Sequence, residues 1–369
     1  MFKGLHLWLP SYLRRRRAPW DSSRETHLIL CVCDHFEPFH GATQSEALAR
    51  LDRWEEKFPP LSDSIRDSSG HPLTHTFFHP IEQSDPEVLA ALARLCRSTR
   101  CEAEIHLHHK NDTAENLAAT LEKGKRDLAG HGLLSTDSSG AIRFGFIHGN
   151  WALDNSHPAR AHCGVSNELR VLQEAGCYAD FTMPSAPDST QTAIINSVYY
   201  ATPSNRPKSH NHGRPARVGI VDPPGFLLVQ GPLGLNWRWR KWGFLPRIEN
   251  GDLTPNNPPT LARLQLWLDL HVHVAGRPDW IFANLHTHGG IPPNMDMLLG
   301  STMRQFHGSL PHFAASHPHF HYHYVTAREL VNIVHAAEAG ETGNPAGYRD
   351  FRYASRVRTT VSHSQSSEP

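Results

Sequence analysis

Histidines and carboxylates follow several of the strands that this sequence predicts. The chain holds 28 histidines in 369 residues, and histidine both binds metals and transfers protons near neutral pH. Because the carboxyl ends of parallel strands meet at one edge of a sheet or barrel, side chains that end different strands are expected to converge there. The residues in question are Asp34, His35 and Glu37, then His79, then Glu104, His106, His108 and His109, then His148, Asn150 and Trp151, and finally His286 and His288. Their convergence would create a metal site or an acid–base site.

The spacing within two of these groups suits a divalent cation. Side chains alternate across a strand, so Glu104, His106 and His108 share one face of theirs. His286 and His288 share a face in the same way. Two imidazoles that lie two residues apart can hold a metal when a carboxylate completes the set. Each histidine taken alone could equally be a packed, hydrogen-bonded residue.

Three carboxylates have roles that the sequence leaves open. Asp34 directly follows an apolar strand and is either a metal ligand or a base whose pKa is raised by burial. Glu37 resembles it but lies further toward solvent. Asp112 precedes a predicted helix, so it is either the N-cap of that helix or a ligand.

Apolar runs and helix-capping signals alternate along most of the chain. The predicted strands are 27–33, 75–79, 103–109, 142–149, 177–183, 280–288 and 320–326. The predicted helices are 84–96 (capped by Ser84 or Asp85), 112–128 (with a box-like cap from Asp112 to Glu115), 166–176 (capped by Ser166), 260–275, 293–315 and 327–340. Strands that alternate with helices in this way indicate an α/β fold with a parallel sheet or barrel.

The chain is expected to divide into three parts. Residues 1–24 form a basic and apolar extension, residues 25–350 the β/α unit, and residues 351–369 a polar tail that is disordered at its end. The alternation breaks from about 185 to 259, where Pro, Asn and Gly are frequent and some strand is expected at 225–231. We interpret 185–259 as a long insertion.

Composition excludes several classes of partner. The 36 basic residues balance 36 acidic ones, so no charged field points to nucleic acid. Six cysteines without a CxxC pair favour a reducing, cytoplasmic compartment. No run of about 18 apolar residues exists, so no transmembrane segment is predicted. Peripheral membrane contact is a further hypothesis for the N-terminus, where four apolar residues adjoin four arginines: Leu5, Trp8, Leu9 and Leu13 beside Arg14, Arg15, Arg16 and Arg17.

In this order, the motifs resemble those of the polysaccharide deacetylase, or NodB-homology, family. In that family a strand ends in an Asp-Asp pair, and here Asp34-His35 stands at that place with Glu37 just after. A GHEIGNH motif with a second His four residues later is matched by CEAEIHLHHKND, which puts His108 and Asp112 at the two His positions. The second Asp of the pair and the second His of that motif are therefore replaced.

Other segments extend the resemblance to roughly 25–183 and 260–338. The family's ATFF-like strand is similar to Thr76-Phe77-Phe78, and its Leu-x-His motif is similar to LHTHG, with Leu285, His286 and His288. NELRVLQEAGCYADF and YVTARELVNIV look like further helix and strand segments of the family. An Arg-x-Pro-x-Gly motif is absent, and HGNW stands in its place.

The resemblance implies an irregular (β/α) barrel of about seven parallel strands with a long insertion. It implies a hydrolase that uses a divalent metal, Zn²⁺, and metal-activated water to deacetylate an N-acetylated or O-acetylated sugar or polysaccharide precursor. The expected metal ligands are His35, His106, His108 and Asp112. Asp34 or Glu37 is the expected base and His286 or His288 the expected acid, while His148, Asn150 and Trp151 are expected to contact the substrate.

Three other functions stay open. A glycosidase on the same barrel would need two facing carboxylates, Asp34 or Glu37 with Asp154 or Asp180. A phosphoesterase of the PHP type has a His-x-His motif, but at its first strand rather than near the end of the chain. A non-catalytic glycan-binding protein would keep the barrel without turnover. The insertion is either a solvated excursion or a lid over the site, whose tryptophans, Trp237, Trp239 and Trp242, could stack on sugar rings.

Overall fold

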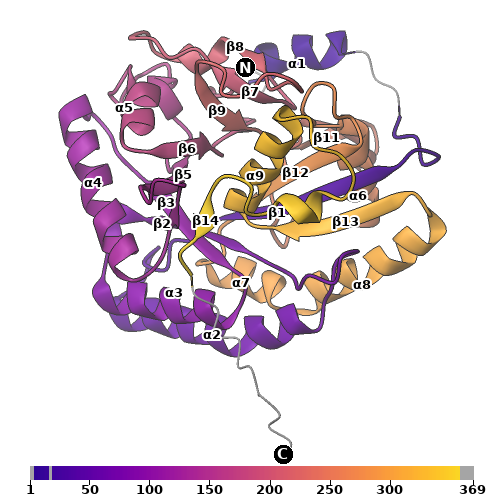
Figure 1. Cartoon of the computed structure of the whole chain (residues 1–369), viewed down its shortest axis with the longest axis horizontal. Coiled ribbons are helices and arrows are strands. Elements are labelled where there is room, and N and C mark those ends of the chain that lie inside the picture. The colour runs from indigo at the N-terminus through magenta and orange to yellow at the C-terminus, as the bar shows by residue number, and fades with distance from the viewer. Residues whose placement is uncertain (1–3, 16–18, 358–369) are drawn as a thin grey trace, which may run out of the picture.

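A computed structural model describes residues 4–15 and 19–357 of the chain (Figure 1). Its centre is a mostly parallel sheet of 12 strands, surrounded by helices. Eight strands are joined by parallel pairing. They are β1 (Thr26–His35), β2 (Thr76–Pro80), β3 (Glu102–Leu107), β5 (Ile142–His148), β6 (Cys177–Asp180), β9 (Phe226–Val229), β12 (Trp280–Thr287) and β13 (Phe320–Val325). The mixed α/β class is therefore confirmed.

The strand count differs from the expected seven, and the described pairing does not close the sheet into a ring. The hydrogen-bonded order runs β12-β1-β2-β3-β5-β6-β9-β7-β8, so β12 and β8 are its ends. Four short strands add antiparallel pairs: β4 (Ser135–Thr136), β7 (Val198–Ala201), β8 (Gly213–Pro215) and β14 (Ala354–Ser355). The segment 185–259 contributes β7, β8 and β9 to this sheet, and it also forms a separate hairpin of β10 (Gly234–Lys241) and β11 (Leu245–Glu249).

β1 is the strand around which the sheet is organised. One edge pairs with β12 along almost its whole length. The other edge pairs first with β13, through Thr26–Cys31, and then with β2, through Cys33–His35. The carboxyl end of β1, which carries Asp34 and His35, therefore lies between the ends of β12 and β2.

Most of the helices lie where the sequence predicts a helix, but they begin or end at other residues than predicted. They are α1 (Leu5–Arg14), α2 (Gln44–Asp63), α3 (Pro86–Ser98), α4 (Ala114–Gly130), α5 (Glu168–Glu174), α6 (Leu261–Leu270), α7 (Pro292–Leu298), α8 (Ser301–Ser316) and α9 (Ala327–Glu338). The sequence pattern does not predict α1 or α2, because prolines interrupt both. The start of α2 could have been recognised in the sequence from the capping box that Thr43 and Glu46 form.

Two predicted helix caps are wrong. Thr113, not Asp112, accepts the backbone N–H bond that caps α4. Ser166 does not cap α5, whose N-cap position is Asn167 without a side-chain bond. Asp85 does cap α3, because its carboxylate accepts the N–H groups of Glu87 and Val88.

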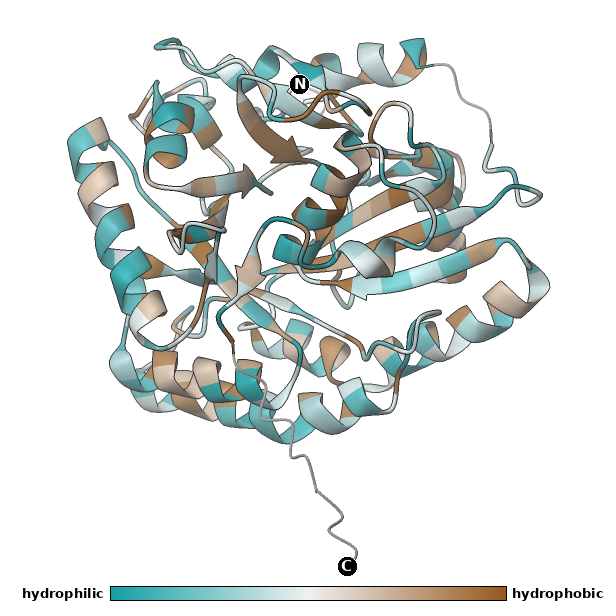
Figure 2. Cartoon of the chain, in the orientation of Figure 1, coloured by the Kyte–Doolittle hydropathy of each residue, from teal (hydrophilic) through white to brown (hydrophobic). Residues whose placement is uncertain are grey.

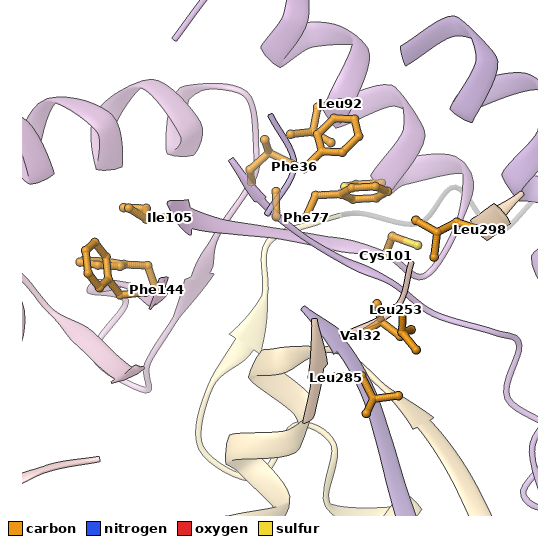
Figure 3. Close-up of a cluster of buried hydrophobic side chains, with 14 of the residues drawn as sticks. Val32, Phe36, Phe77, Leu92, Cys101, Ile105, Phe144, Leu253, Leu285 and Leu298 are labelled. Carbon is orange, nitrogen blue, oxygen red and sulfur yellow. The ribbon is translucent and has the colours of Figure 1, made fainter. Parts of the chain in front are cut away.

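Alternate residues of β1 face two different cores. Leu28, Leu30 and Val32 belong to the larger core, between the sheet and helices α2 to α8; we call this the outer face. Figure 3 shows part of this core, where Phe36, Phe77 and Leu92 pack together. Figure 2 shows apolar colour along the strands and hydrophilic colour on much of the surrounding helices. The sheet is thus buried on both sides, as parallel sheets usually are.

The second core lies on the face that we call the inner face. Ile29, Cys31 and Cys33 of β1 point to it and pack with α9, whose Leu330 and Val334 are fully buried. Figure 1 shows α9 inside the curve of the sheet rather than outside with the other helices. Apolar side chains of α9 therefore cover part of the inner face of the sheet.

The described part of the N-terminus is packed onto the protein. Trp8 and Tyr12 of α1 are buried against Leu233 and Leu270, so the structure gives no support to the predicted membrane contact. Arg16 and Arg17 lie outside the described residues, as does the tail from 358 for which disorder was predicted. Among the described residues, no helix has the length and apolar character needed to cross a bilayer.

Acid should destabilise the fold partly through His307 of α8. The imidazole is buried beside the Tyr324 hydroxyl, 2.8 Å away, and desolvation lowers its pKa to about 3. Its pKa lies below the usual value of 6.5, so its contribution to stability is complete above pH 6.5 and declines as the pH falls toward 3. In denaturant titrations between pH 6 and 4, His307→Gln should lose about 1.4 kcal/mol less stability per pH unit than the wild type.

The control for this prediction is His312→Gln on the same helix. His312 is exposed, so its replacement should leave the pH slope unchanged. A His307→Gln slope identical to that of the wild type would mean that His307 is already protonated in the folded protein.

Candidate active site

Three side chains meet at the carboxyl ends of β1 and β3. His106 Nε2 and His108 Nε2 each lie 3.2 Å from the same oxygen, Oε1 of Glu37. Their ligand atoms all lie within 4.8 Å of one another. His106 extends from the inner face of β3, since its neighbours Ile105 and Leu107 pack in the outer core. We call Glu37, His106 and His108 the rim triad.

Hydrogen bonds around the rim triad fix the orientation of His108. Glu82 Oε1 lies 2.7 Å from His108 Nδ1, so the other ring nitrogen is turned to Glu37. Burial alone would lower the pKa of His108, but hydrogen bonds to Glu37 and Glu82 outweigh it and raise this pKa to about 9. Burial would raise the pKa of Glu37, but hydrogen bonds from His106 and His108 hold it well below its usual range.

Four aromatic side chains form a wall beside the rim triad. The His35 ring lies with its centroid 4.9 Å from His106, 4.7 Å from His288, 5.9 Å from His286 and 5.2 Å from Trp151. Burial and the neighbouring imidazoles lower the pKa of His35 well below 6.5. Burial, with smaller contributions from His288 and Arg263, lowers the pKa of His286 to about 3. Both rings are therefore neutral near pH 7. The fourth side chain of the wall, His288, is half-buried.

Three glycine positions let the loops approach this closely. A Cβ at Gly149 would lie 2.3 Å from the His108 ring. A Cβ at Gly289 would lie 2.1 Å from Asp34 Oδ2, and one at Gly290 would lie 2.5 Å from the Glu37 backbone. The absence of a side chain therefore brings the loop after β12 against the end of β1, and the loop after β5 against His108.

Gly149→Ala is expected to displace His108 from Glu37 without unfolding the protein. The added methyl group cannot occupy space that the imidazole already fills, so the ring must move. We expect the affinity for a divalent ion to fall by about 10- to 100-fold, as it does when the support of a ligand is lost. Titration calorimetry with Zn²⁺ would measure this. Gly347→Ala, where φ is likewise not positive and an added Cβ would meet nothing within 4 Å, is the control; equal effects of both variants would contradict the prediction.

The structure brings seven of the eleven residues singled out from the sequence to one place. These are His35, Glu37, His106, His108, Trp151, His286 and His288. Trp151 reaches the wall from a backbone in the left-handed region, with φ at 60°, which is a strained conformation for a bulky residue.

Asp34 lies on the opposite side of β1 from His35. It is fully buried, its Oδ2 lies 2.8 Å from His75 Nε2, and its Oδ1 accepts the Gly289 N–H at 2.5 Å. Both carboxylate oxygens therefore have partners away from the rim triad. Asp34 ties the β12 loop, which carries His288, to the end of β1.

Three further predicted residues also lie elsewhere. Asp112 Oδ2 is 3.2 Å from His109 Nδ1, and its other oxygen accepts bonds from the Thr113 N–H and the Asn116 side-chain amide at the start of α4. His148 extends from the outer face of β5 and lies beside His109, with ring centroids 4.6 Å apart. Asn150 donates to the backbone oxygen of His109. These side chains gather around Glu168, behind the strand that supplies the rim triad.

Sequence reasoning missed Glu82 and His75, the outer partners of His108 and Asp34. Both lie next to β2, whose end drew notice only for His79. His79 itself is fully buried on the outer face, and neither of its ring nitrogens has a partner within the described chain. A search for carboxylates beside every strand end would have found Glu82.

The rim triad is chemically suited to a divalent ion. Two imidazole nitrogens and a carboxylate oxygen are the donor set of many catalytic zinc sites, which keep a position open for water. Glu82 supplies the carboxylate that such histidine ligands commonly bond through their other ring nitrogen. The residues present therefore fit a metal.

Comparison with known proteins adds little to this geometry. No protein family model matches the sequence, and no curated protein matches it. Among solved structures, the chain is similar to a candidate polysaccharide deacetylase from Mycobacterium smegmatis. The identity is 14%, the TM-score is 0.40, and the alignment covers 89% of this chain and 96% of that one. So remote a likeness says nothing of the reaction, which depends on the side chains.

Proposed function

We propose that this protein is a metal-dependent hydrolase that removes an acetyl group from a sugar or a polysaccharide precursor. The observation that supports the proposal is the rim triad, in which two imidazoles and a carboxylate meet beside four further aromatic side chains. The order of sequence motifs, which resembles that of the polysaccharide deacetylases, favours this reaction among those open to such a site.

In this proposal, Glu37, His106 and His108 would hold the metal. A bound Zn²⁺ supplies Lewis acidity, which activates water and polarises the acyl carbonyl. Glu82 would keep one proton of His108 on Nδ1, so that Nε2 could offer its lone pair once the metal has displaced the proton from that atom. The other predicted ligands take other roles: Asp112 bonds His109, while His35 stands beside the triad.

Proton transfer is assigned to His35 and His288, whose rings lie 4.7 Å apart. His35 is neutral, because burial and the neighbouring imidazoles lower its pKa, and so it can accept a proton from water. His288 is partly open to solvent and returns a proton to the leaving group. Asp34, one of the two bases expected from the sequence, becomes a positioning residue because it holds the Gly289 N–H and not the substrate.

Substrate contact is assigned chiefly to Trp151. Its ring faces His35 and His286 and is partly exposed, so a sugar ring could stack on it. Trp237 and Trp242 are 53% and 79% exposed on the β10–β11 hairpin and remain available to a longer glycan.

Glycoside hydrolysis has weaker support from the side chains. Asp154 and Asp180, the proposed partner carboxylates, are fully buried. Asp154 Oδ2 accepts both bonds that Ser209 donates, and Asp180 accepts both from Thr182. Neither is placed to face Glu37 across an open site, as paired carboxylates of a glycosidase must be.

Acetate release tests the proposal. Purified protein would be stripped with a chelator, reloaded with Zn²⁺, and incubated with N-acetylated and O-acetylated oligosaccharides. We expect acetate release that disappears on chelation and returns with metal, and that depends on His288. Release of reducing sugar ends instead of acetate would favour a glycosidase, and a metal-loaded protein that releases neither would overturn the assignment.

A further inference from the structure

A second cluster of potential metal ligands lies behind the rim triad. It consists of His109, His148, Cys163 and Glu168, all of them buried. One ligand atom from each lies within 4.8 Å of those from the other three. His108 and His109 follow β3 directly and point in different directions, because His108 contacts Glu37 of the rim triad and His109 contacts Glu168 of this cluster. We call these four residues the inner cluster. The name refers to the burial of all four side chains, since they lie on the outer face of the sheet and the rim triad lies on the inner face.

We propose that the inner cluster binds a second divalent ion, a structural Zn²⁺ that is separate from the catalytic site. The donors are two imidazoles, a thiol and a carboxylate, a borderline-soft set that favours zinc over magnesium or calcium. Structural zinc sites have four protein ligands and no open position. The burial of all four residues matches that description, whereas the rim triad is a three-ligand site beside a partly exposed histidine.

The distances within the inner cluster centre on Glu168. His109 Nε2 lies 3.0 Å and His148 Nε2 3.9 Å from its Oε1, while Cys163 Sγ lies 3.4 Å from its Oε2. Ligands about 2.1 Å from a shared ion at tetrahedral angles are about 3.4 Å apart. Small movements would therefore bring these atoms into coordination range.

One further observation points to a ligand. His148 Nε2 is completely buried, has no hydrogen-bond partner in the described chain, and is directed toward Glu168. An unpaired buried polar atom is costly, and an ion would satisfy it. The position of Cys163, in the loop between β5 and α5, is also fixed by the backbone, because the Asp112 N–H donates to the Cys163 carbonyl at 2.9 Å. A Cβ at Gly164 would lie only 2.5 Å from Asp112 N.

Metal binding would exchange protons for the ion. Cys163 would release its thiol proton, and His109 the proton that it shares with Glu168. Coordination through Nε2 would place the proton of His148 on Nδ1. That atom now accepts the Asn150 N–H at 3.2 Å, so the peptide at Asn150 would have to turn away.

Metal binding at the inner cluster would fix the position of the loop between β5 and α5. This segment contains little regular structure apart from one short 3-10 turn, Leu153–Asn155. It carries Trp151, which faces His35 and His286 in the candidate active site. The inner cluster would therefore hold the substrate-binding side of the rim in place from behind.

Cobalt substitution tests the proposal, because a thiolate ligand gives Co²⁺ an intense charge-transfer absorption in the near ultraviolet. The rim triad contains no cysteine, so this band would report on the inner cluster alone. We expect the band in the wild type and in His108→Ala, and its loss in Cys163→Ser. Cys177→Ser is the control: Cys177 is also buried but does not belong to the inner cluster, so the band should persist.

Metal analysis provides the second measurement. The wild type should hold two Zn²⁺ per chain, and Cys163→Ser and His108→Ala should each hold one. Wild-type protein without a thiolate band under saturating Co²⁺ would overturn the proposal even if Cys163→Ser failed to fold. A thiolate band in a protein that shows no acetate release would instead leave the inner cluster standing and contradict the proposed reaction.

Discussion

His106→Ala is expected to remove the rim metal and reduce turnover by about 10²–10⁴, the range typical of a lost catalytic group. His106 supplies one of the two imidazoles of the rim triad and is completely buried. Metal affinity should fall by more than about 100-fold, since even outer partners of ligands contribute 10- to 100-fold. Zinc titration, the rate of acetate release and circular dichroism would be measured on the same preparation.

His40→Ala is the matched control for His106→Ala. His40 also contacts Glu37, with Nδ1 3.4 Å from Oε2, but its side chain is 60% exposed. It should therefore change metal affinity far less. Equal losses in the two variants would mean that Glu37 acts only through its charge and does not bind a metal together with His106. If His106→Ala retained zinc and turnover, the metal would have to bind elsewhere.

Glu249→Ala should destabilise the fold by about 3–5 kcal/mol, the cost of leaving a buried charge without its partner. Arg263 forms two parallel bonds to Glu249, at 2.8 and 2.7 Å, and both side chains are 1% exposed. The guanidinium also donates to the backbone oxygens of Asn257, Pro258 and Asp252. Chemical denaturation at pH 7 would measure the loss.

The same variant should weaken the active site, because the loop that the ion pair holds is bonded to β12. Gly251 O accepts the His286 N–H, and His286 O accepts the Leu253 N–H. Arg277→Ala provides a control, since Arg277 pairs with Asp279 at a longer 3.8 Å and nearer the surface. The double variant Glu249→Leu with Arg263→Met should recover much of the stability, because it leaves no unpaired charge. A loss below about 1 kcal/mol in Glu249→Ala would show that the pair is solvated.

Much of the fold followed from local patterns in the sequence. The apolar runs that became β1, β2, β3, β5, β6, β12 and β13 are each short, and capping or stop signals follow most of them. Their alternation with helices predicted a parallel sheet because parallel strands need a crossover between them. β9 was missed as a parallel strand because Phe226–Val229 pairs with β6 through a single register position and lies among turns. Such pairing leaves no periodic signal.

The sequence also predicted that a set of potential metal ligands would gather at the strand ends, but not which side chains would belong to it. His106 and His148 look equivalent in sequence, since each is a histidine at the carboxyl end of a predicted strand. In the structure, His106 joins Glu37 on the inner face, while His148 joins Glu168 on the outer face. Asp34 and His35 are divided in the same way, because consecutive residues of a strand point to opposite sides.

Only the tertiary structure could decide between the two faces. In a sheet with one wet side, the polar positions of each strand would have revealed the orientation, but here both faces pack against apolar cores. Alternation along β1 or β5 then tells which residues share a face but not which face that is. The choice depends on where α9 packs, and α9 lies about 180 residues after β5 in the chain, beyond the reach of any local pattern.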